Sequence, residues 1–81
     1  PFYPITTFNY SLFENSFVDI TVYDLLGNKV NNFVNEIQAS GNQIVQWNAT
    51  NSQGEVVSAG VYLYKIQVGT YSRTKKMILL K

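Results

Sequence analysis

The side chains that could do chemistry in this chain are few, and none forms a pattern typical of catalysis. The 81 residues include no histidine and no cysteine, so the commonest general base, the commonest metal ligand and any disulfide are absent. The carboxylates are Glu14, Asp19, Asp24, Glu36 and Glu55. None of them sits with another at a spacing that indicates an acid–base pair. We therefore expect no enzymatic activity, no catalytic residue, no metal site and no cofactor.

Cationic side chains gather in the last third of the chain, and they are Lys65, Arg73, Lys75, Lys76 and Lys81. On a hairpin they could form one basic stripe that meets an anionic partner. The same residues could instead protect an edge strand from unwanted pairing, and the two interpretations are compatible. The formal net charge is only +1, which gives no global field for nucleic acid, so we expect no nucleic-acid partner.

The aromatic residues Trp47, Tyr62 and Tyr64 also admit two interpretations. The tyrosines lie at i and i+2, on the same face of a predicted strand. With Trp47 they could form a platform that stacks on a sugar, or all three could be core residues, as in many β-sandwiches. We favour the core.

The polar segment 48–55 superficially resembles a calcium loop. A tight site for a hard cation needs several carboxylates. This segment offers only Glu55, and Ala49 stands where a first Asp would be needed. We therefore interpret the segment as a polar turn.

Short alternating runs separated by turn residues predict one all-β domain, an antiparallel β-sandwich of about seven strands. The predicted strands are Thr6–Leu12, Phe17–Tyr23, Lys29–Ile37, Gln43–Asn48, Val56-Val57 and the two strands of a hairpin that turns at Gly69-Thr70. The predicted core residues are Val18, Ile20, Val22, Val45, Trp47, Tyr62 and Tyr64. The predicted turn glycines are Gly27, Gly41, Gly54, Gly60 and Gly69.

Two of these segments do not follow simple alternation. In Lys29–Ile37 the apolar residues Val30, Phe33, Val34 and Ile37 also fit two helical turns, although the three asparagines of the segment are poor helix formers. At the end of the chain, Met77 and Leu79 point to one face and Ile78 and Leu80 to the other. One of these pairs must be covered by another part of the chain or recognised by a partner.

The chain is the size of one domain. It begins with Pro1, so we expect a piece of a longer protein. No run approaches the roughly 20 apolar residues that a bilayer span needs, and no membrane span is expected.

Five ordered segments resemble the C-terminal sorting domain (type A) of proteins exported by the type IX secretion system of Bacteroidota. They are Pro1–Phe8, Val18–Val30, Ser40–Asn48, Gly54–Tyr64 and Lys75–Lys81, and they are similar to the family's PFNPxTxI, VxLxVYDxxGRxV, AGxHxVxWD, GxxVxSGxYxY and KKMxLLK. The departures lie in loops: Tyr3 replaces an Asn, Gln43 a His and Ala49 a Gly, while Asn48 and Asn51 replace carboxylates. These domains are similar in turn to the immunoglobulin-like module of the flagellar hook-capping protein.

The resemblance implies an immunoglobulin-like or fibronectin III-like β-sandwich, with residues 1–81 forming the single C-terminal domain of a larger protein. It implies a non-catalytic export address that the outer-membrane type IX translocon recognises and that a sortase-like peptidase commonly removes from the upstream cargo. The protein would pass through the periplasm to the cell surface or the medium. The implied sorting signal is Lys75, Lys76, Met77, Ile78, Leu79, Leu80 and Lys81.

We expect deletion of Met77–Lys81 to abolish export of an attached cargo without unfolding the domain. The alternative is an immunoglobulin-like structural or carbohydrate-binding module of a surface enzyme, which would be indifferent to the last five residues. A hook-capping module is a third possibility, and it should lie inside a longer chain.

Overall fold

The computed structural model describes residues 5–80, and these form six β-strands joined by turns. The strands are β1 (Thr6–Leu12), β2 (Ser16–Tyr23), β3 (Lys29–Gln38), β4 (Gly41–Trp47), β5 (Gly60–Val68) and β6 (Tyr71–Leu79). Pro1–Pro4 of the opening motif and Lys81 of the implied sorting signal lie outside the described residues. Nowhere in residues 5–80 is there a helix long and apolar enough to cross a bilayer.

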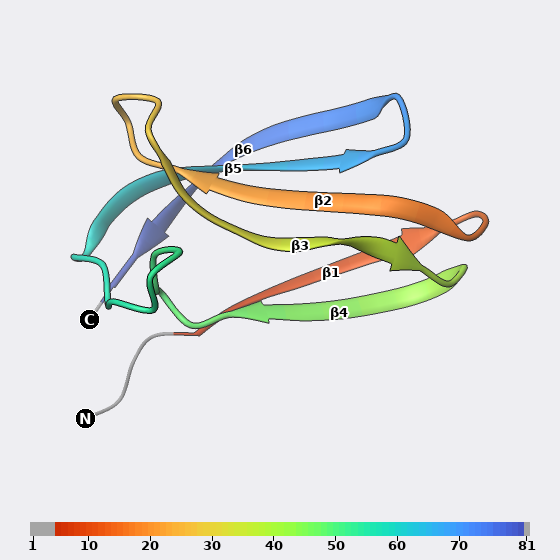
Figure 1. Ribbon diagram of the computed structural model, residues 1–81, viewed down its shortest axis with the longest axis horizontal. Helices are drawn as coiled ribbons and strands as arrows, with labels where there is room; N and C mark the ends of the chain where they lie inside the picture. The colour runs from red at the N-terminus through yellow and green to blue at the C-terminus, as the bar shows by residue number, and fades with distance from the viewer. Residues whose placement is uncertain (1–4, 81) are drawn as a thin grey trace.

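The strands form two antiparallel sheets of unequal width, which lie as two layers (Figure 1). The small sheet pairs β1 with β4, and the large sheet has the order β3-β2-β5-β6. Two hairpins, β2–β3 and β5–β6, meet where β2 pairs with β5 in the middle of the large sheet. The all-β prediction from alternation is confirmed.

The core lies between the two layers. From the large sheet, Val18, Ile20 and Val22 are fully buried, as the alternation of β2 requires. From the small sheet, Phe8, Leu12 and Trp47 pack against them in two adjoining clusters. The other predicted core residues are Val45, Tyr62 and Tyr64; Tyr62 is buried, while Val45 and Tyr64 are half-buried and pack on the clusters.

The irregular apolar spacing of β3 has its origin in two shifts of register against β2. Ile20 pairs with Val34 but Thr21 pairs with Asn32, and the next shift lies between Val22 and Tyr23. The skipped residues on β3 are Phe33 and Val30, both of which pack on the core. A bulge places two residues of one strand opposite one of its partner, so the spacing that also fitted helical turns is that of a bulged strand.

The predicted strand at Val56-Val57 is wrong, because among residues 5–80 this segment forms only an isolated bridge between Val56 and Thr50. Residues 48–59 fold into a compact loop stabilised by its own polar groups. The side-chain oxygen of Asn51 accepts hydrogen bonds from the main-chain N–H of Gln53 at 3.0 Å and of Glu55 at 2.9 Å. Main-chain groups that a seventh strand would have used for pairing thus form hydrogen bonds within the loop.

All five predicted turn glycines have positive φ angles; they are Gly27, Gly41, Gly54, Gly60 and Gly69. The requirement is clearest at Gly69, which has a φ of 58° and is the first residue of the two-residue connection between β5 and β6. A tight hairpin of this kind needs a residue that enters the left-handed region easily.

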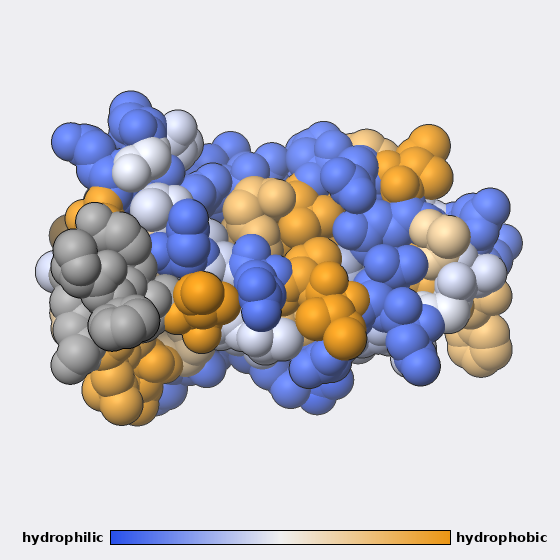
Figure 2. All heavy atoms as spheres, turned by 90° about the horizontal axis from the view of Figure 1, so that it is seen from below, coloured by the Kyte–Doolittle hydropathy of each residue, from blue (hydrophilic) through white to orange (hydrophobic). Residues whose placement is uncertain are grey.

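The outward face of the small sheet is mixed in character. Seen from that side, hydrophobic residues lie as separate spots between hydrophilic ones (Figure 2). Thr7, Asn9 and Ser11 of β1 are among the exposed residues. In this view the described residues do not form one continuous apolar surface of the kind that marks an interface.

Candidate functional site on the terminal strand

The implied sorting signal begins in the middle of β6, which is an edge strand. Within the described residues, β6 pairs with β5 on one side and has no strand on the other. An edge of this kind offers unpaired N–H and C=O groups to a further strand. The edge of β6 away from β5 therefore has no strand partner in residues 5–80.

The C-terminal part of β6 has one buried and one exposed side. Leu79 lies opposite Gly60 and is only 2% exposed, and Met77 lies half-buried opposite Tyr62. Both contact the cluster that contains Trp47. Ile78 and Leu80, in contrast, are 67% and 74% exposed. Of the two pairs in the final apolar run, Met77 and Leu79 are covered by the chain itself, and Ile78 and Leu80 are not.

Ile78 has apolar neighbours on the outward face of the large sheet. It pairs with Val61, and the next outward residue of β5 is Leu63, which pairs with Lys76. Val61 and Leu63 are half-buried. We call Val61, Leu63, Ile78 and Leu80 the outer apolar patch, and Lys76 lies at its margin.

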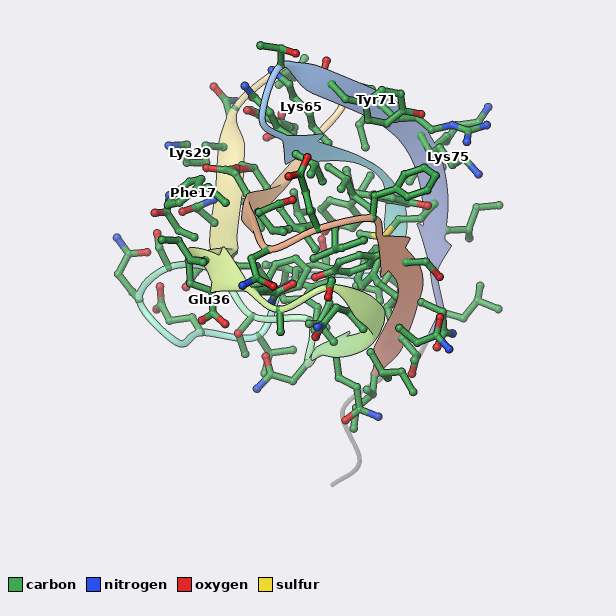
Figure 3. All side chains as sticks on the ribbon, turned by 90° about the vertical axis from the view of Figure 1, so that its right-hand side faces the viewer. Phe17, Lys29, Glu36, Lys65, Tyr71 and Lys75 are labelled. Carbon is green, nitrogen blue, oxygen red and sulfur yellow. The ribbon has the colours of Figure 1, made fainter. Side chains whose placement is uncertain are left out.

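The predicted basic stripe is divided between two faces. Lys76 points outward beside the patch, whereas Arg73 and Lys75 alternate with it and belong to the side of β6 that faces the small sheet. Tyr71 shares that side, and Figure 3 shows Tyr71 and Lys75 next to β6, across the molecule from Phe17 and Glu36. Lys65 pairs with Thr74, so it belongs to the outward set.

The aromatic rings that could have stacked on a sugar are engaged in the core. Trp47 is 2% exposed, and its Nε1 donates a hydrogen bond to the main-chain carbonyl of Thr50 at 2.9 Å. The Tyr62 ring packs edge-on against Trp47, and its hydroxyl donates to the carbonyl of Ser58. The Tyr64 ring packs edge-on against Phe8. No open platform remains for a sugar ring on these three side chains.

The polar loop likewise uses its donors and acceptors internally. Besides its main-chain contacts, Asn51 donates from its side-chain amide to the carboxylate of Glu55 at 3.2 Å. Asn31 of β3 donates to the carbonyl of Thr50 at 2.9 Å, which fixes the loop to the large sheet. Among the described residues, no group of three or more acidic, His or Cys side chains is placed to hold a metal ion.

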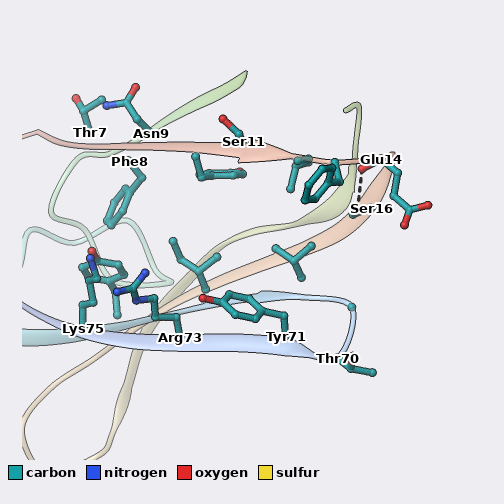
Figure 4. A pocket seen from close by; sticks show the side chains of 17 residues that line it. Thr7, Phe8, Asn9, Ser11, Glu14, Ser16, Thr70, Tyr71, Arg73 and Lys75 are labelled. Carbon is teal, nitrogen blue, oxygen red and sulfur yellow. Dashed lines mark hydrogen bonds between the residues drawn. The ribbon is translucent and has the colours of Figure 1, made fainter. Parts of the chain in front are cut away.

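Sequence reasoning missed a groove between the two sheets. It has a volume of about 740 Å³ and lies between β1 and the β5–β6 hairpin (Figure 4). Its lining includes Tyr64, Ile66, Val68, Arg73 and Lys75. A signal was present in β6, where the inward positions change from Tyr71, Arg73 and Lys75 to apolar residues at Met77. Polar residues at inward positions indicate that nothing covers them.

The two perturbed titrating groups lie away from the terminal strand. At the β2–β3 turn, hydrogen bonds from Asn28, Leu26 and Gly27, the main-chain N–H of Asn28 foremost, hold the pKa of Asp24 below its ordinary value. In β1, burial raises the pKa of Tyr10, whose hydroxyl donates a hydrogen bond to Gln38.

Comparison with known proteins places this geometry in a family. Residues 2–80 match the secretion system C-terminal sorting domain. No curated protein sequence matches the chain. The fold is similar to solved structures of FlgD from P. aeruginosa (25% identity, TM-score 0.71) and from Xanthomonas campestris (20% identity, TM-score 0.69).

The alignments cover 93% and 91% of this chain but only 58% and 54% of the FlgD chains, so the chain spans little more than half of their length. The second of these structures concerns hook capping in flagellar assembly. The family match extends over nearly the whole sequence, including all of β6 and Leu80. The chain belongs to the family of secretion system C-terminal sorting domains.

Proposed function

We propose that this chain is a type IX sorting domain that directs an attached cargo protein across the outer membrane and has no catalytic role. The observation that carries the proposal is the division of the terminal strand. Leu79 and Met77 are held in the core, whereas Ile78 and Leu80 are exposed on an edge strand at the end of the family match. Such a strand has a fixed backbone and a free apolar face.

Recognition would use two features of β6 together. The free edge offers main-chain groups for strand addition, and the outer apolar patch offers side-chain contacts that give specificity. Lys76 and, beyond the described residues, Lys81 would contribute charge on the same segment. We propose the complete signal as Lys75–Lys81.

The domain as a whole would serve as a rigid support for this signal. We propose an immunoglobulin-like β-sandwich that comprises residues 1–81 as one C-terminal domain of a larger protein. The similarity to FlgD over 93% of the chain supports this topology. The buried rows of β2 and the positive-φ glycines at the turns support the proposed core and turn roles.

The partners would be the outer-membrane type IX translocon of a Bacteroidota cell and a sortase-like peptidase that removes the domain from its cargo. The protein would be periplasmic in transit and then reach the cell surface or the medium. The family match supports this assignment, since the family is defined by sorting at a C-terminus.

The test is a fusion of this chain to the C-terminus of a periplasm-targeted fluorescent reporter, expressed with and without a working translocon. Deletion of Met77–Lys81 would also remove Leu79 from the core, so replacement of outward side chains is the sharper perturbation. We expect Ile78→Ser with Leu80→Ser to leave the reporter in the periplasm while the domain stays folded.

The matched control is Ile44→Ser on β4, because Ile44 and Ile78 are both isoleucines with 67% exposure. The control should be exported normally. Export of the Ile78→Ser/Leu80→Ser fusion at the unsubstituted rate would refute the proposal, as would export of every fusion in the strain without a translocon.

The carbohydrate-binding alternative has no support from the geometry, since Trp47 and Tyr62 are buried. A purely structural module predicts that the reporter stays in the periplasm of both strains. That outcome, with the fusion folded, would replace the sorting proposal.

A further inference from the structure

The groove between β1 and β6 exists because the small sheet is narrower than the large one. Two strands face four. Among the described residues, no strand of the small sheet lies beyond β1, and the start of β6 is left without a layer above it. The inward residues of β5 at this point, Tyr64, Ile66 and Val68, are only half-buried. The gap lies where a third strand of the small sheet would pair with β1.

The upper wall of the groove is the free edge of β1. Thr7, Asn9 and Ser11 line the groove, yet in Figure 4 their side chains point away from it. The inward side chains of β1 in the lining are those of Phe8, Tyr10 and Leu12. β1 also offers its main chain, whose alternate N–H and C=O groups have no strand partner among the described residues on the side away from β4. An added polypeptide strand can satisfy these groups, and the apolar side chains of β5 form a floor beneath it.

The lower wall carries a regular series of side chains. Lys75, Arg73 and Tyr71 project from β6 toward β1 (Figure 4) and are exposed. They stand two residues apart, which is about 7 Å along a strand. A strand in the groove would present its own inward side chains at the same interval. Carboxylates at alternate positions would therefore meet Arg73 and Lys75.

The far end of the groove carries two aromatic side chains. Phe13 and Tyr71 line it, and both are exposed. The carboxylate in the lining is Glu14, which follows Phe13 at the same end. Negative charge in a ligand is thus favoured at the Lys75 end and an apolar side chain at the Tyr71 end.

We propose that this groove binds an acidic, extended segment of another protein, which adds to β1 as a third strand of the small sheet. Its inward residues would be two carboxylates followed by an apolar side chain. A second copy of this chain does not provide the segment, because no two of its five carboxylates stand two residues apart. The surface is distinct from the outer apolar patch, so the proposal does not depend on export.

The test uses the purified 81-residue chain, labelled with ¹⁵N, and a synthetic ten-residue peptide that carries Glu at positions 3 and 5 and Phe at position 7, with Thr elsewhere. We expect the peptide to shift the amide resonances of the chain mainly in β1 and β6. We also expect it to slow hydrogen exchange of the β1 amides. Replacement of both Glu residues by Lys should abolish these effects. Higher salt should weaken binding, because the charges are near the surface.

Two neighbouring lysines give a matched pair of variants. Lys75→Gln should weaken binding about threefold at low salt, since an exposed ion pair contributes a few-fold. Lys76→Gln removes the same charge from the opposite face and should leave the affinity unchanged. Equal losses from the two variants would overturn the proposal, since they would indicate only a general charge effect.

A sulfated dextran serves as the competing class of anion. If it produced the same shifts more strongly than the peptide, without slowing exchange in β1, the groove would be an anionic-polysaccharide site and the strand-addition proposal would be wrong. Failure of the peptide to shift any groove residue at millimolar concentration would also overturn it.

Discussion

The two halves of β6 have the same alternation of inward and outward residues but different surroundings. From Met77 onward the inward side chains join the core, in the cluster that also contains Ala49 and Val57 of the long loop. From Tyr71 to Lys75 the inward side chains face a groove. The difference comes from what the rest of the chain places opposite, since both halves pair with β5 in one continuous register. The half from Met77 onward fixes the strand to the core, and we call it the anchored half. The half from Tyr71 to Lys75 is left exposed to the groove.

The largest effect should come from the anchored half. Leu79→Ala removes a side chain that is 2% exposed, and such deletions typically cost about 2–5 kcal/mol of unfolding free energy. Ile78→Ala, one residue away on the outward face, should change it by about 0.5 kcal/mol or less. Urea unfolding of both variants checks this, and equal losses would contradict the assigned faces.

A smaller loss of stability should come from a substitution in the loop of residues 48–59, which shares a core cluster with the anchored half. Ala49 is fully buried in the cluster of Leu79 and has a φ of 61°, a conformation in which L-residues are disfavoured. Ala49→Val adds volume and a branched Cβ there, and should destabilise the domain by about 1–3 kcal/mol.

Ala49→Gly is the control for this prediction, since the family pattern has Gly at that position. It relieves the backbone but loses a methyl group worth about 0.8 kcal/mol, so the two effects nearly cancel. Thermal unfolding compares the variants. If Ala49→Val were as stable as the unsubstituted protein, Ala49 would not be tightly packed in the cluster that contains Leu79.

The smallest effect concerns the pH dependence of stability at the Asp24 turn. Tyr23 pairs with Leu63, which pairs with Lys76, so the Asp24 turn lies near the point where the anchored half begins. Because the pKa of Asp24 is lowered from 3.8 in the folded state, its contribution to stability is present above that value and is lost as the pH falls through the folded pKa.

Asp24→Asn should therefore flatten the decline of stability below about pH 4. The measurement is the urea midpoint across an acid pH series, for both proteins. A parallel decline in the two proteins would show that other carboxylates govern the acid limb.

Local pattern predicted much of this fold because β1, β2 and β5 alternate regularly against one buried layer. It failed where a residue's role depends on distant segments. The bulges that bring Phe33 inward are set by the register with β2, and residues 48–59 use their polar groups within the loop rather than in a strand. For the candidate site, alternation predicted that Met77 and Leu79 lie on one face and Ile78 and Leu80 on the other. Which pair is buried depends on the distant segments that form the cluster around Trp47. The groove follows from the unequal sheet widths, and its signal in the sequence is limited to the inward residues Tyr71, Arg73 and Lys75 of β6.

The strand order also has a consequence for the sequence of folding events. The hairpins β2–β3 and β5–β6 are closed by short turns, whereas β1 and β4 pair across the whole of the β2–β3 hairpin, from Leu12 with Gly41 to Thr6 with Trp47. Contacts between distant residues carry a larger loop-closure entropy and form more slowly. The pairing of β2 with β5 joins residues still farther apart, from Tyr23 with Leu63 to Val18 with Val68. The two hairpins are thus expected to form first, and both the small sheet and the β2–β5 pairing later. Trp47, the single tryptophan, lies in the small sheet, so its fluorescence should follow a step later than hairpin formation.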